Sequence, residues 1–246
     1  MKISKIKNKH LLKPSFTASD FIKKYSPNFK SPKTAIAVFN KNFFWEAVKK
    51  YKAKKLPYDN FYEISKNLAL TLSPIGSPAF CVKAEELYAA GAERIIIFGT
   101  AGSLREDLKP GEFVLCKGAL IDEGVSKHYV SSKKTLSYPS KDLTYELKKI
   151  LDEKKIRYRC GFSWTVDAPY RESLKEVDYY SSKGIMTAEM EASSLFSLSF
   201  VKRKQSAALF VISDILKGNN KGFAFHYKSL KENYRLGLDL LCEHFR

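Results

Sequence analysis

Long hydrophobic runs are absent from this sequence of 246 residues, and cysteine is scarce. No apolar run approaches the roughly 18 residues that a membrane-spanning helix needs, so we expect no membrane partner. Residues 1–13 are basic but contain no apolar stretch, which is not typical of a signal peptide. The cysteines match no metal-ligand spacing, so we predict no metal site and interpret them as reduced thiols of a cytoplasmic protein. They are Cys81, Cys116, Cys160 and Cys242.

Acidic residues are also few. The chain has 26 Asp and Glu against 43 Lys and Arg, which gives a net charge of +17. A surface of this charge is one feature of nucleic-acid-binding proteins. The lysines are scattered and follow no nucleic-acid motif, however, and an AT-rich genome also encodes many Lys, Asn, Ile, Phe and Tyr residues. We therefore consider a nucleic-acid partner unlikely, while a positive field that attracts an anionic substrate such as phosphate stays possible.

The composition favours one folded domain with a basic N-terminal extension. A hydrophobic content of 44% in a chain of this length is enough for one sizeable core. Residues 1–33 are polar and basic, and Pro14, Pro27 and Pro32 interrupt any long element there. We expect residues 1–33 to form an arm that wraps a surface or a neighbouring subunit, and residues 34–246 to form a single domain.

Short apolar runs alternate with segments of helical periodicity along this domain. Such alternation predicts an α/β fold, a three-layer sandwich with a mixed, largely parallel central sheet. Ser77 is expected to be the N-cap of one helix, with Pro78 at its first position and Gly91 at its end. We expect strands at 34–39, 68–72, 94–98, 113–117, 158–166, 185–188 and 207–212, and further helices at 43–54, 141–154, 173–183, 191–201 and 227–245.

Polar groups follow several of the expected strands at the point where each strand ends. Gly99 and Thr100 follow one strand, and Asp167, Glu189 and Asp214 follow three others. Ligands of α/β sheets bind beyond the carboxyl ends of the strands. The sequence therefore predicts a binding site at this edge of the sheet.

Five segments lie near these strand ends: Ile75–Pro78, Gly99–Leu104, Asp167–Tyr170, Glu189–Ala192 and Ser213–Asp214. In order and spacing, from about residue 34 to 216, they resemble the purine nucleoside phosphorylase and uridine phosphorylase superfamily. The resemblance implies a nucleoside phosphorylase-like fold, cleavage of an N-glycosidic bond, and a homo-oligomer, either a dimer or a hexamer. It implies no cofactor, only inorganic phosphate as a co-substrate of a phosphorylase.

The resemblance also implies roles for the acidic residues. The segment Glu189-Met190-Glu191 holds the ribose, and Glu191 bonds its 2′ and 3′ hydroxyls, where a carboxylate favours developing positive charge. Alternatively, both glutamates favour only a helix N-terminus. Asp214 protonates a purine-like base if burial raises its pKa; alternatively, it caps a turn.

Other residues match the family's base and sugar contacts. Pro169 and Tyr170, beside Asp167, match the stretch that walls the base, where an aromatic ring stacks on a purine, although a core tyrosine fits the same pattern. His10 matches a histidine that reaches across a dimer interface to the ribose 5′ side. The alternative for His10 is a solvated side chain in a basic arm.

The family's anion site is largely missing. The loop at residues 39–44 has neither the Gly-Asp-Pro motif nor its arginine, and Ile97 stands where another arginine is usual. Gly99 and Thr100 remain, with nearby backbone N–H groups. Lys41 is a possible substitute, although lysine lacks the bidentate fork of arginine. After Asp214, the chain has Lys217, Lys221 and His226 where the purine branch has an arginine.

The sequence therefore does not decide whether phosphate or water is the nucleophile. Nucleosidases of the family use water and a glutamate after the first strand, but the first carboxylate here is Glu46, inside the expected helix. We consider a phosphorylase acting on a purine-type nucleoside the leading hypothesis. A hydrolytic nucleosidase and a non-catalytic nucleoside-binding member are the alternatives.

Overall fold

The computed structural model of the chain describes residues 6–218, 222–223 and 227–246. Strands and helices alternate along it, as the sequence predicts. The strands are β1 (Thr34–Val38), β2 (Lys54–Lys55), β3 (Phe61–Ser65), β4 (Leu68–Leu72), β5 (Arg94–Ser103), β6 (Phe113–Asp122), β7 (Leu136–Ser137), β8 (Tyr158–Val166), β9 (Ile185–Glu189), β10 (Gln205–Ile215) and β11 (Gly222–Phe223). The helices are α1 (Ala18–Tyr25), α2 (Lys41–Lys50), α3 (Ser77–Ala89), α4 (Lys141–Glu153), α5 (Leu174–Ser182), α6 (Ala192–Lys202) and α7 (Lys228–Phe245), with 3-10 turns η1 (Lys9–Leu11), η2 (Ser126–His128) and η3 (Pro169–Arg171).

All strands join one mixed sheet, in the order β11-β10-β6-β8-β9-β5-β1-β4-β3-β2, with β7 beside β6. The pairings β4–β1, β1–β5, β5–β10, β6–β8 and β8–β9 are parallel. Because β10 pairs with both β5 and β6, and β9 pairs back with β5, the strands β5, β10, β6, β8 and β9 close into a ring. The predicted α/β class with a mixed central sheet is confirmed.

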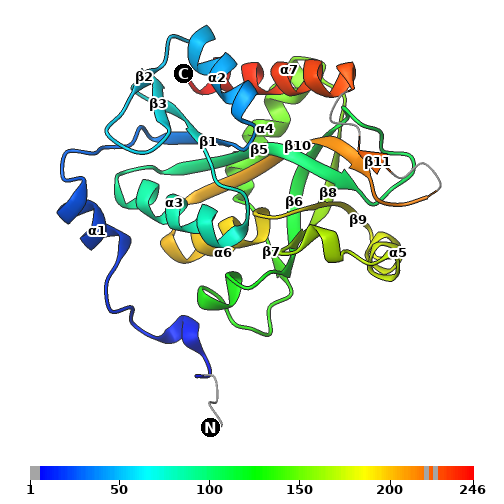
Figure 1. Cartoon of the computed structure of the whole chain (residues 1–246), viewed down its shortest axis with the longest axis horizontal. Coiled ribbons are helices and arrows are strands. Elements are labelled where there is room, and N and C mark those ends of the chain that lie inside the picture. Colours follow the sequence, from blue (N-terminus) through cyan, green and yellow to red (C-terminus); the bar gives the residue numbers. More distant parts are fainter. Residues whose placement is uncertain (1–5, 219–221, 224–226) are drawn as a thin grey trace.

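Helices cover both faces of this sheet (Figure 1). The side chains of β1, which point alternately to the two faces, show which helices lie on each face. Ile36 and Val38 pack against the side of α2, α4 and α7. Ala35 and Ala37 face the other side, with α3 and α6. Because every residue of β1 is buried, the strand is a continuous apolar run rather than an alternating one, as expected for a strand covered on both faces.

The strand β5 is longer than its apolar run. The sequence predicted a strand that ends at Phe98, but β5 continues through Gly99 and Thr100 to Ser103. The reason is tertiary, because β10 pairs with β5 along this whole length, with one shift of register after Ile212. The same pairing extends β10 beyond the predicted end at Ile212.

The start of α3 differs from the prediction in a way that concerns the site. Gly76, not Ser77, is the N-cap, with a φ of 96° that favours glycine. Ser77 is the first helical residue, and its hydroxyl donates to the Met190 carbonyl at 2.7 Å. The predicted capping role of Ser77 is therefore wrong, because this side chain connects α3 to the segment before α6.

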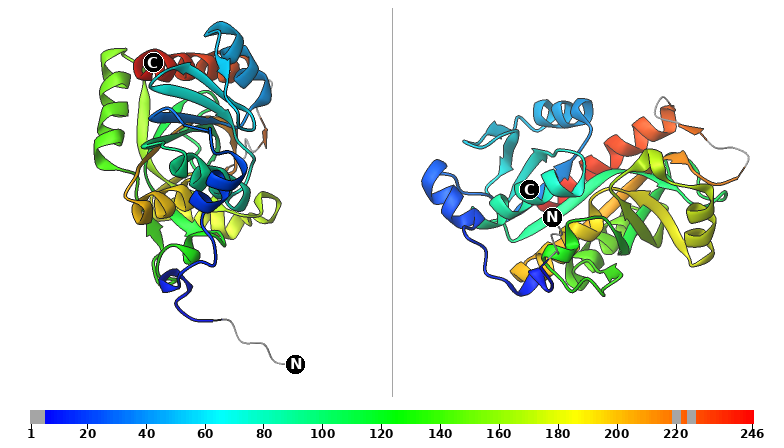
Figure 2. Two further views of the ribbon diagram at one scale, coloured as in Figure 1. Left: turned by 90° about the vertical axis from the view of Figure 1, so that its left-hand side faces the viewer. Right: turned by 60° about the horizontal axis from the view of Figure 1, so that its bottom comes forward.

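The N-terminal extension is partly docked on the domain. Helix α1 lies between Pro14 and Pro27, and its Ile22 is buried in the core on the α3 side. Phe29 is also buried and stacks on Tyr58 with 4.7 Å between ring centroids. Before α1 the chain runs along the surface to η1, which lies beside η2 (Figure 2).

Among the described residues, no helix combines the length and the apolar character needed to cross a membrane. The same residues contain no group of three or more His, Cys, Asp or Glu side chains that is placed to hold a metal ion. The four cysteines are free thiols, and only Cys160 is exposed.

Candidate functional site

A gap beside β5 marks the candidate site. On one edge β5 pairs with β1 as far as Phe98, and it pairs with β9 only from Gly102. Between them, Gly99, Thr100 and Ala101 have no strand on that edge within the described chain. The opposite edge pairs with β10 throughout. Such a change of neighbour is where α/β sheets bind ligands, and the unpaired backbone groups need a partner.

The strand register gathers the predicted acidic segments around Gly102. On one side Gly102 lies opposite Asp214 of β10, and on the other it lies opposite Ala188, which precedes Glu189. With about 4.8 Å between strands, the Asp214 and Ala188 backbones lie about 10 Å apart. A Cβ at Gly102 would stand 2.9 Å from Asp214 Oδ2 and 3.0 Å from the Leu216 side chain, so any other residue here would displace these side chains. Thr100 is two residues earlier on β5.

The carboxylate of Glu189 is fully engaged inside the protein. Its Oε1 accepts hydrogen bonds from the hydroxyls of Thr165 at 2.5 Å and Ser163 at 3.2 Å. Its Oε2 accepts the backbone N–H groups of Glu191 and Ala192 at 2.8 and 2.7 Å. Glu189 thus fixes the first turn of α6, in agreement with the helix N-terminus interpretation. Burial raises the pKa of this carboxyl.

Glu191 is buried as well, at 7% exposure, but has fewer partners. The Gly76 N–H donates to its Oε1, and the Met190 backbone also favours its charged form. Burial, and then the charge of Glu189, raise the pKa of Glu191 to about 8. Hydroxyls of a ligand that donate to this carboxyl would stabilise its ionised form. Glu191, unlike Glu189, can therefore accept further hydrogen bonds, such as those from the hydroxyls of a sugar.

Asp214 projects from a distortion near the end of β10. The register against β5 shifts between Ile212 and Asp214, and such irregularities re-aim side chains. The carboxyl is 8% exposed, and its Oδ1 accepts a hydrogen bond from the Ser213 hydroxyl at 2.6 Å. Burial raises the pKa of Asp214. This is the shift that a carboxylic acid needs in order to donate a proton near neutral pH.

A second carboxyl near Asp214 was not found from the sequence. Burial, the charge of Asp214 and then that of Glu176 raise the pKa of half-buried Glu172 to about 7. Burial has the larger effect, and the negative charge of Asp214 adds to it, so both favour the protonated form of Glu172. Glu172 follows η3 directly, and no spacing in the sequence connects it with Asp214.

The predicted base wall is not assembled in this structure. Tyr170 is 95% exposed, and Pro169 beside it is exposed as well. Asp167 is also exposed, and its Oδ2 accepts the Gly124 N–H at 2.8 Å, which ties η3 to the loop after β6. The structure therefore does not bring Tyr170 against Asp214 or Glu191, and its stacking on a base stays a prediction.

His10 lies in a different hollow. It lines a groove of about 930 Å³ between the N-terminal extension, α3, the η2 region and the end of α6, together with Val82, His128, Tyr129 and Val201. Thr100, Glu191 and Asp214 do not line this groove. A role of His10 at the ribose of a neighbouring subunit, and the homo-oligomer itself, stay predictions.

Thr100 lines a smaller cavity of about 280 Å³, together with Asn40 and Asn42 from the start of α2. Lys41, the predicted anion contact, is exposed and does not line it. The cationic side chains of the lining are Lys231 and Arg235 of α7. Sequence reasoning missed them, because about 130 residues separate them from Thr100 and no motif marks them.

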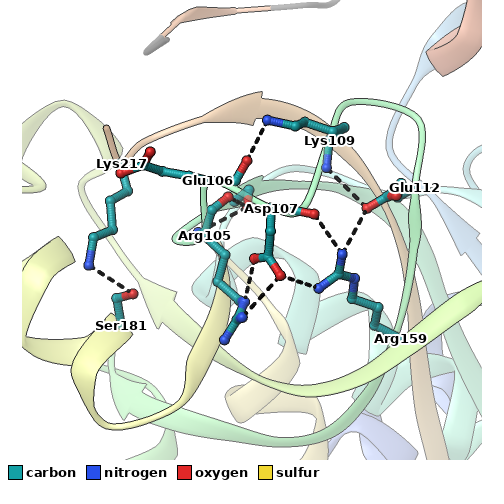
Figure 3. A network of polar contacts seen from close by, with 9 residues as sticks. Arg105, Glu106, Asp107, Lys109, Glu112, Arg159, Ser181 and Lys217 are labelled. Carbon is teal, nitrogen blue, oxygen red and sulfur yellow. Dashed lines mark hydrogen bonds and ion pairs between the residues drawn. The ribbon is translucent and has the colours of Figure 1, made fainter. Parts of the chain in front are cut away.

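A network of charged side chains connects the loop after β5 with β8, near the end of β10 (Figure 3). Asp107, in the loop after β5, pairs with Arg105 at 2.8 Å and with Arg159 of β8 at 2.7 Å. Hydrogen bonds from these two arginines hold the pKa of Asp107 well below its usual range. Lys217 bonds Ser181 of α5 at 3.2 Å, so its ammonium is directed to that helix. Lys221 and His226 lie outside the described residues.

Comparison with known proteins places this architecture in a family. The family model described as "Phosphorylase superfamily" matches residues 59–243. A guanosine phosphorylase of Halorubrum lacusprofundi is 30% identical over 175 residues, which are 71% of this chain and 70% of that protein.

Solved structures show the same fold. The uridine phosphorylase of Vibrio fischeri matches with a TM-score of 0.75 and 25% identity, over 87% of this chain and 90% of that one. The AMP nucleosidase of Bacteroides thetaiotaomicron matches with a TM-score of 0.73 and 18% identity, over 92% and 97% of the two chains, and shows the fold alone. The predicted nucleoside phosphorylase-like fold is confirmed.

Proposed function

The chain belongs to the phosphorylase superfamily, and on this basis we propose that it cleaves the N-glycosidic bond of a purine-type nucleoside with inorganic phosphate. A phosphate oxygen bonds to C1′ of the ribose while the bond from C1′ to the base breaks. The products are the free base and ribose 1-phosphate. The observation that carries this proposal is the register at Gly102 of β5, which has Asp214, a buried carboxyl with a raised pKa, on one edge and Ala188, directly before the Glu189–Glu191 segment, on the other.

Each side chain has a distinct task in this reaction. Glu191 binds the ribose hydroxyls, and its negative charge favours the cationic character that the sugar acquires. Asp214 donates its proton to the departing base, which makes the base a better leaving group. Thr100 and the unpaired backbone N–H groups of β5 face the phosphate. The Met190 carbonyl accepts a hydrogen bond from the Ser77 hydroxyl, which fixes the chain between the two glutamates.

Two observations support the choice of base and nucleophile. The similar protein from Halorubrum lacusprofundi is named a guanosine phosphorylase, in keeping with a purine. The carboxylate after the first strand, Glu46, bonds Arg235 at 2.7 and 3.1 Å, and this bond lowers the pKa of Glu46. A carboxylate of lowered pKa is a poor base for activating water, so phosphate is favoured over hydrolysis.

Product analysis tests the proposal. Guanosine, inosine, adenosine and uridine are incubated with the protein, with and without phosphate, and the free base and the sugar product are quantified. We expect release of a purine base that depends on phosphate, with ribose 1-phosphate as the second product. Free ribose at a rate independent of phosphate would show hydrolysis. Ligand-induced stabilisation without turnover would show a binding protein.

The pH dependence tests whether Asp214 and Glu172 share a proton. We expect kcat/KM to fall as the pH rises through about 7, because ionisation of Glu172 removes the last proton of the pair. In Glu172→Gln, a single buried carboxyl loses its proton at lower pH than the pair does, so the alkaline limb should move to lower pH. Asp178→Asn, which changes an exposed carboxylate paired with Lys217, is the control. An unmoved limb in Glu172→Gln would show that Glu172 does not share the proton.

A further inference from the structure

We infer that Lys231 and Arg235 of the C-terminal helix α7 hold the phosphate nucleophile beside Thr100. This inference rests on the proposed phosphorolysis and names the groups that provide its anion site. Both cationic side chains line the 280 Å³ cavity that Thr100 also lines. The volume is near the lower end of ordinary ligand pockets, about 300–1,000 Å³, and is sufficient for a small anion.

The site needs cations from elsewhere because its own strands provide none. Ile97 of β5 is 1% exposed in the core. The start of α2 contributes its N-cap Asn40 and Asn42 to the cavity, and the Asn40 side chain already accepts the N–H groups of Asn42 and Phe43. The first turn of α2 is therefore capped internally, and the positive charge of the cavity comes from α7.

The position of α7 beside β5 is fixed by packing. The Tyr234 hydroxyl donates to the Phe98 carbonyl at 3.1 Å, two residues before Thr100. The Tyr234 ring stacks on Phe43 of α2 with 4.5 Å between centroids. One turn of helix further on, a Cβ at Gly237 would come within 2.6 Å of the Phe98 ring, so this glycine permits the close approach. Residues 231 and 235 are one helical turn apart and share a face with Tyr234.

Arg235 is oriented before any anion arrives. Its Nε and Nη2 bond the two oxygens of Glu46, and its guanidinium carbon lies 5.0 Å from the centre of the Phe43 ring. Its Nη1 has no hydrogen-bond partner within the described chain. A guanidinium held at one edge presents its remaining donors in a fixed direction, which is the geometry that suits a phosphate oxygen.

Lys231 adds a charge that no carboxylate neutralises, since it forms no ion pair among the described residues. The lining thus contains two cations, Lys231 and Arg235, and one anion, Glu46, which leaves one positive charge. A dianion in this cavity gains attraction from Lys231 and hydrogen bonds from Arg235 and the Thr100 hydroxyl. The net positive charge also distinguishes the cavity from the acidic region around Asp214 and Glu172.

The test is the phosphate dependence of turnover in Lys231→Gln and Arg235→Gln. We expect KM for phosphate to rise about tenfold or more in each variant, while KM for the nucleoside stays near the wild-type value. Because Arg235→Gln leaves Glu46 without its partner, the double variant Glu46→Gln/Arg235→Gln should show the same rise in KM for phosphate. Lys228→Gln is the matched control: it removes a lysine from the same helix that does not line the cavity and pairs with Glu232.

The outcomes separate this inference from the proposed function. Phosphate-dependent turnover with unchanged KM for phosphate in both single variants would overturn the α7 anion site and leave phosphorolysis standing. Turnover of the wild type without phosphate would overturn phosphorolysis. In that case the anion site is tested by melting in phosphate: stabilisation of the wild type that Lys231→Gln loses would support the site, and no stabilisation of the wild type would overturn it.

Discussion

Asp214→Asn is expected to bind nucleoside about as well as the wild type and to turn it over about 10²–10⁴-fold more slowly, the usual effect of losing a general acid. Asparagine has nearly the same shape and still accepts the hydrogen bond of the Ser213 hydroxyl. It cannot release a proton to the departing base. The change therefore isolates proton donation from packing, and kcat is the quantity that should fall.

The magnitude follows from the setting of Asp214. Asp214 is 8% exposed, and burial disfavours the charged form of its carboxyl, so the form that holds a proton is favoured. Bulk water has little access to replace that proton, and Glu172 is a nearby carboxyl whose own pKa responds to the charge of Asp214. Partial rescue at low pH, where Glu172 is fully protonated, would identify Glu172 as a secondary donor. Full activity of Asp214→Asn at every pH, with an unchanged Asp178→Asn control, would remove Asp214 from the mechanism.

Glu189→Ala is expected to lower the free energy of unfolding by about 3–5 kcal/mol, as expected when one partner of a buried charged network is removed. For a chain of this size, this corresponds to a decrease of about 6–20 °C in Tm. The alanine leaves the hydroxyls of Thr165 and Ser163 and the backbone N–H groups of Glu191 and Ala192 without their acceptor. Thermal and urea unfolding measure the effect.

Glu191→Ala is the matched comparison, because it removes the same side chain two residues away. Gly76 N–H is the main hydrogen-bond donor that loses its acceptor there, so the loss of stability should be smaller, about 1–3 kcal/mol. Its loss of turnover should be the larger of the two when Glu189→Ala is assayed at a temperature where it is folded. Equal stabilities in the two variants, with equal loss of activity, would contradict this division of structural and sugar-binding roles.

The sequence predicted the architecture well because its strongest signals are local. The apolar run at Ile95–Phe98 has the composition that a strand covered on both faces requires, whatever its partners. The strand at Tyr158–Val166 was also predicted, although it contains Arg159 and the exposed Cys160. Thr100 lies within β5, Asp214 lies within β10 and Glu191 follows β9. Because β5 and β10 are parallel, the approach of Asp214 to the end of β5 follows from the rule for carboxyl ends, whereas β9 meets the end of β5 in an antiparallel pairing that no local pattern predicted.

Tertiary structure decided what those residues do, because pairing and burial join parts of the chain that share no local pattern. The edge of β5 at Gly99–Ala101 has no neighbouring strand because β1 pairs with β5 only as far as Phe98 and β9 pairs with it only from Gly102. The two glutamates have different environments because Thr165 and Ser163, on β8, reach only the first of them. The pKa of Glu172 depends on Asp214, which lies 42 positions away in the numbering.

The positive charge beside Thr100 also could not be predicted from the sequence. By itself, the sequence determined an α/β chain of the phosphorylase type, the acidic residues at its strand ends, and the loss of the usual arginines, since each of these depends on residues near one another along the chain. Lys231 and Arg235 reach the cavity because α7 packs across β5 through Tyr234 and Gly237. The sequence of a helix does not indicate which strand the helix will pack against, so only the tertiary structure could show where these cations lie.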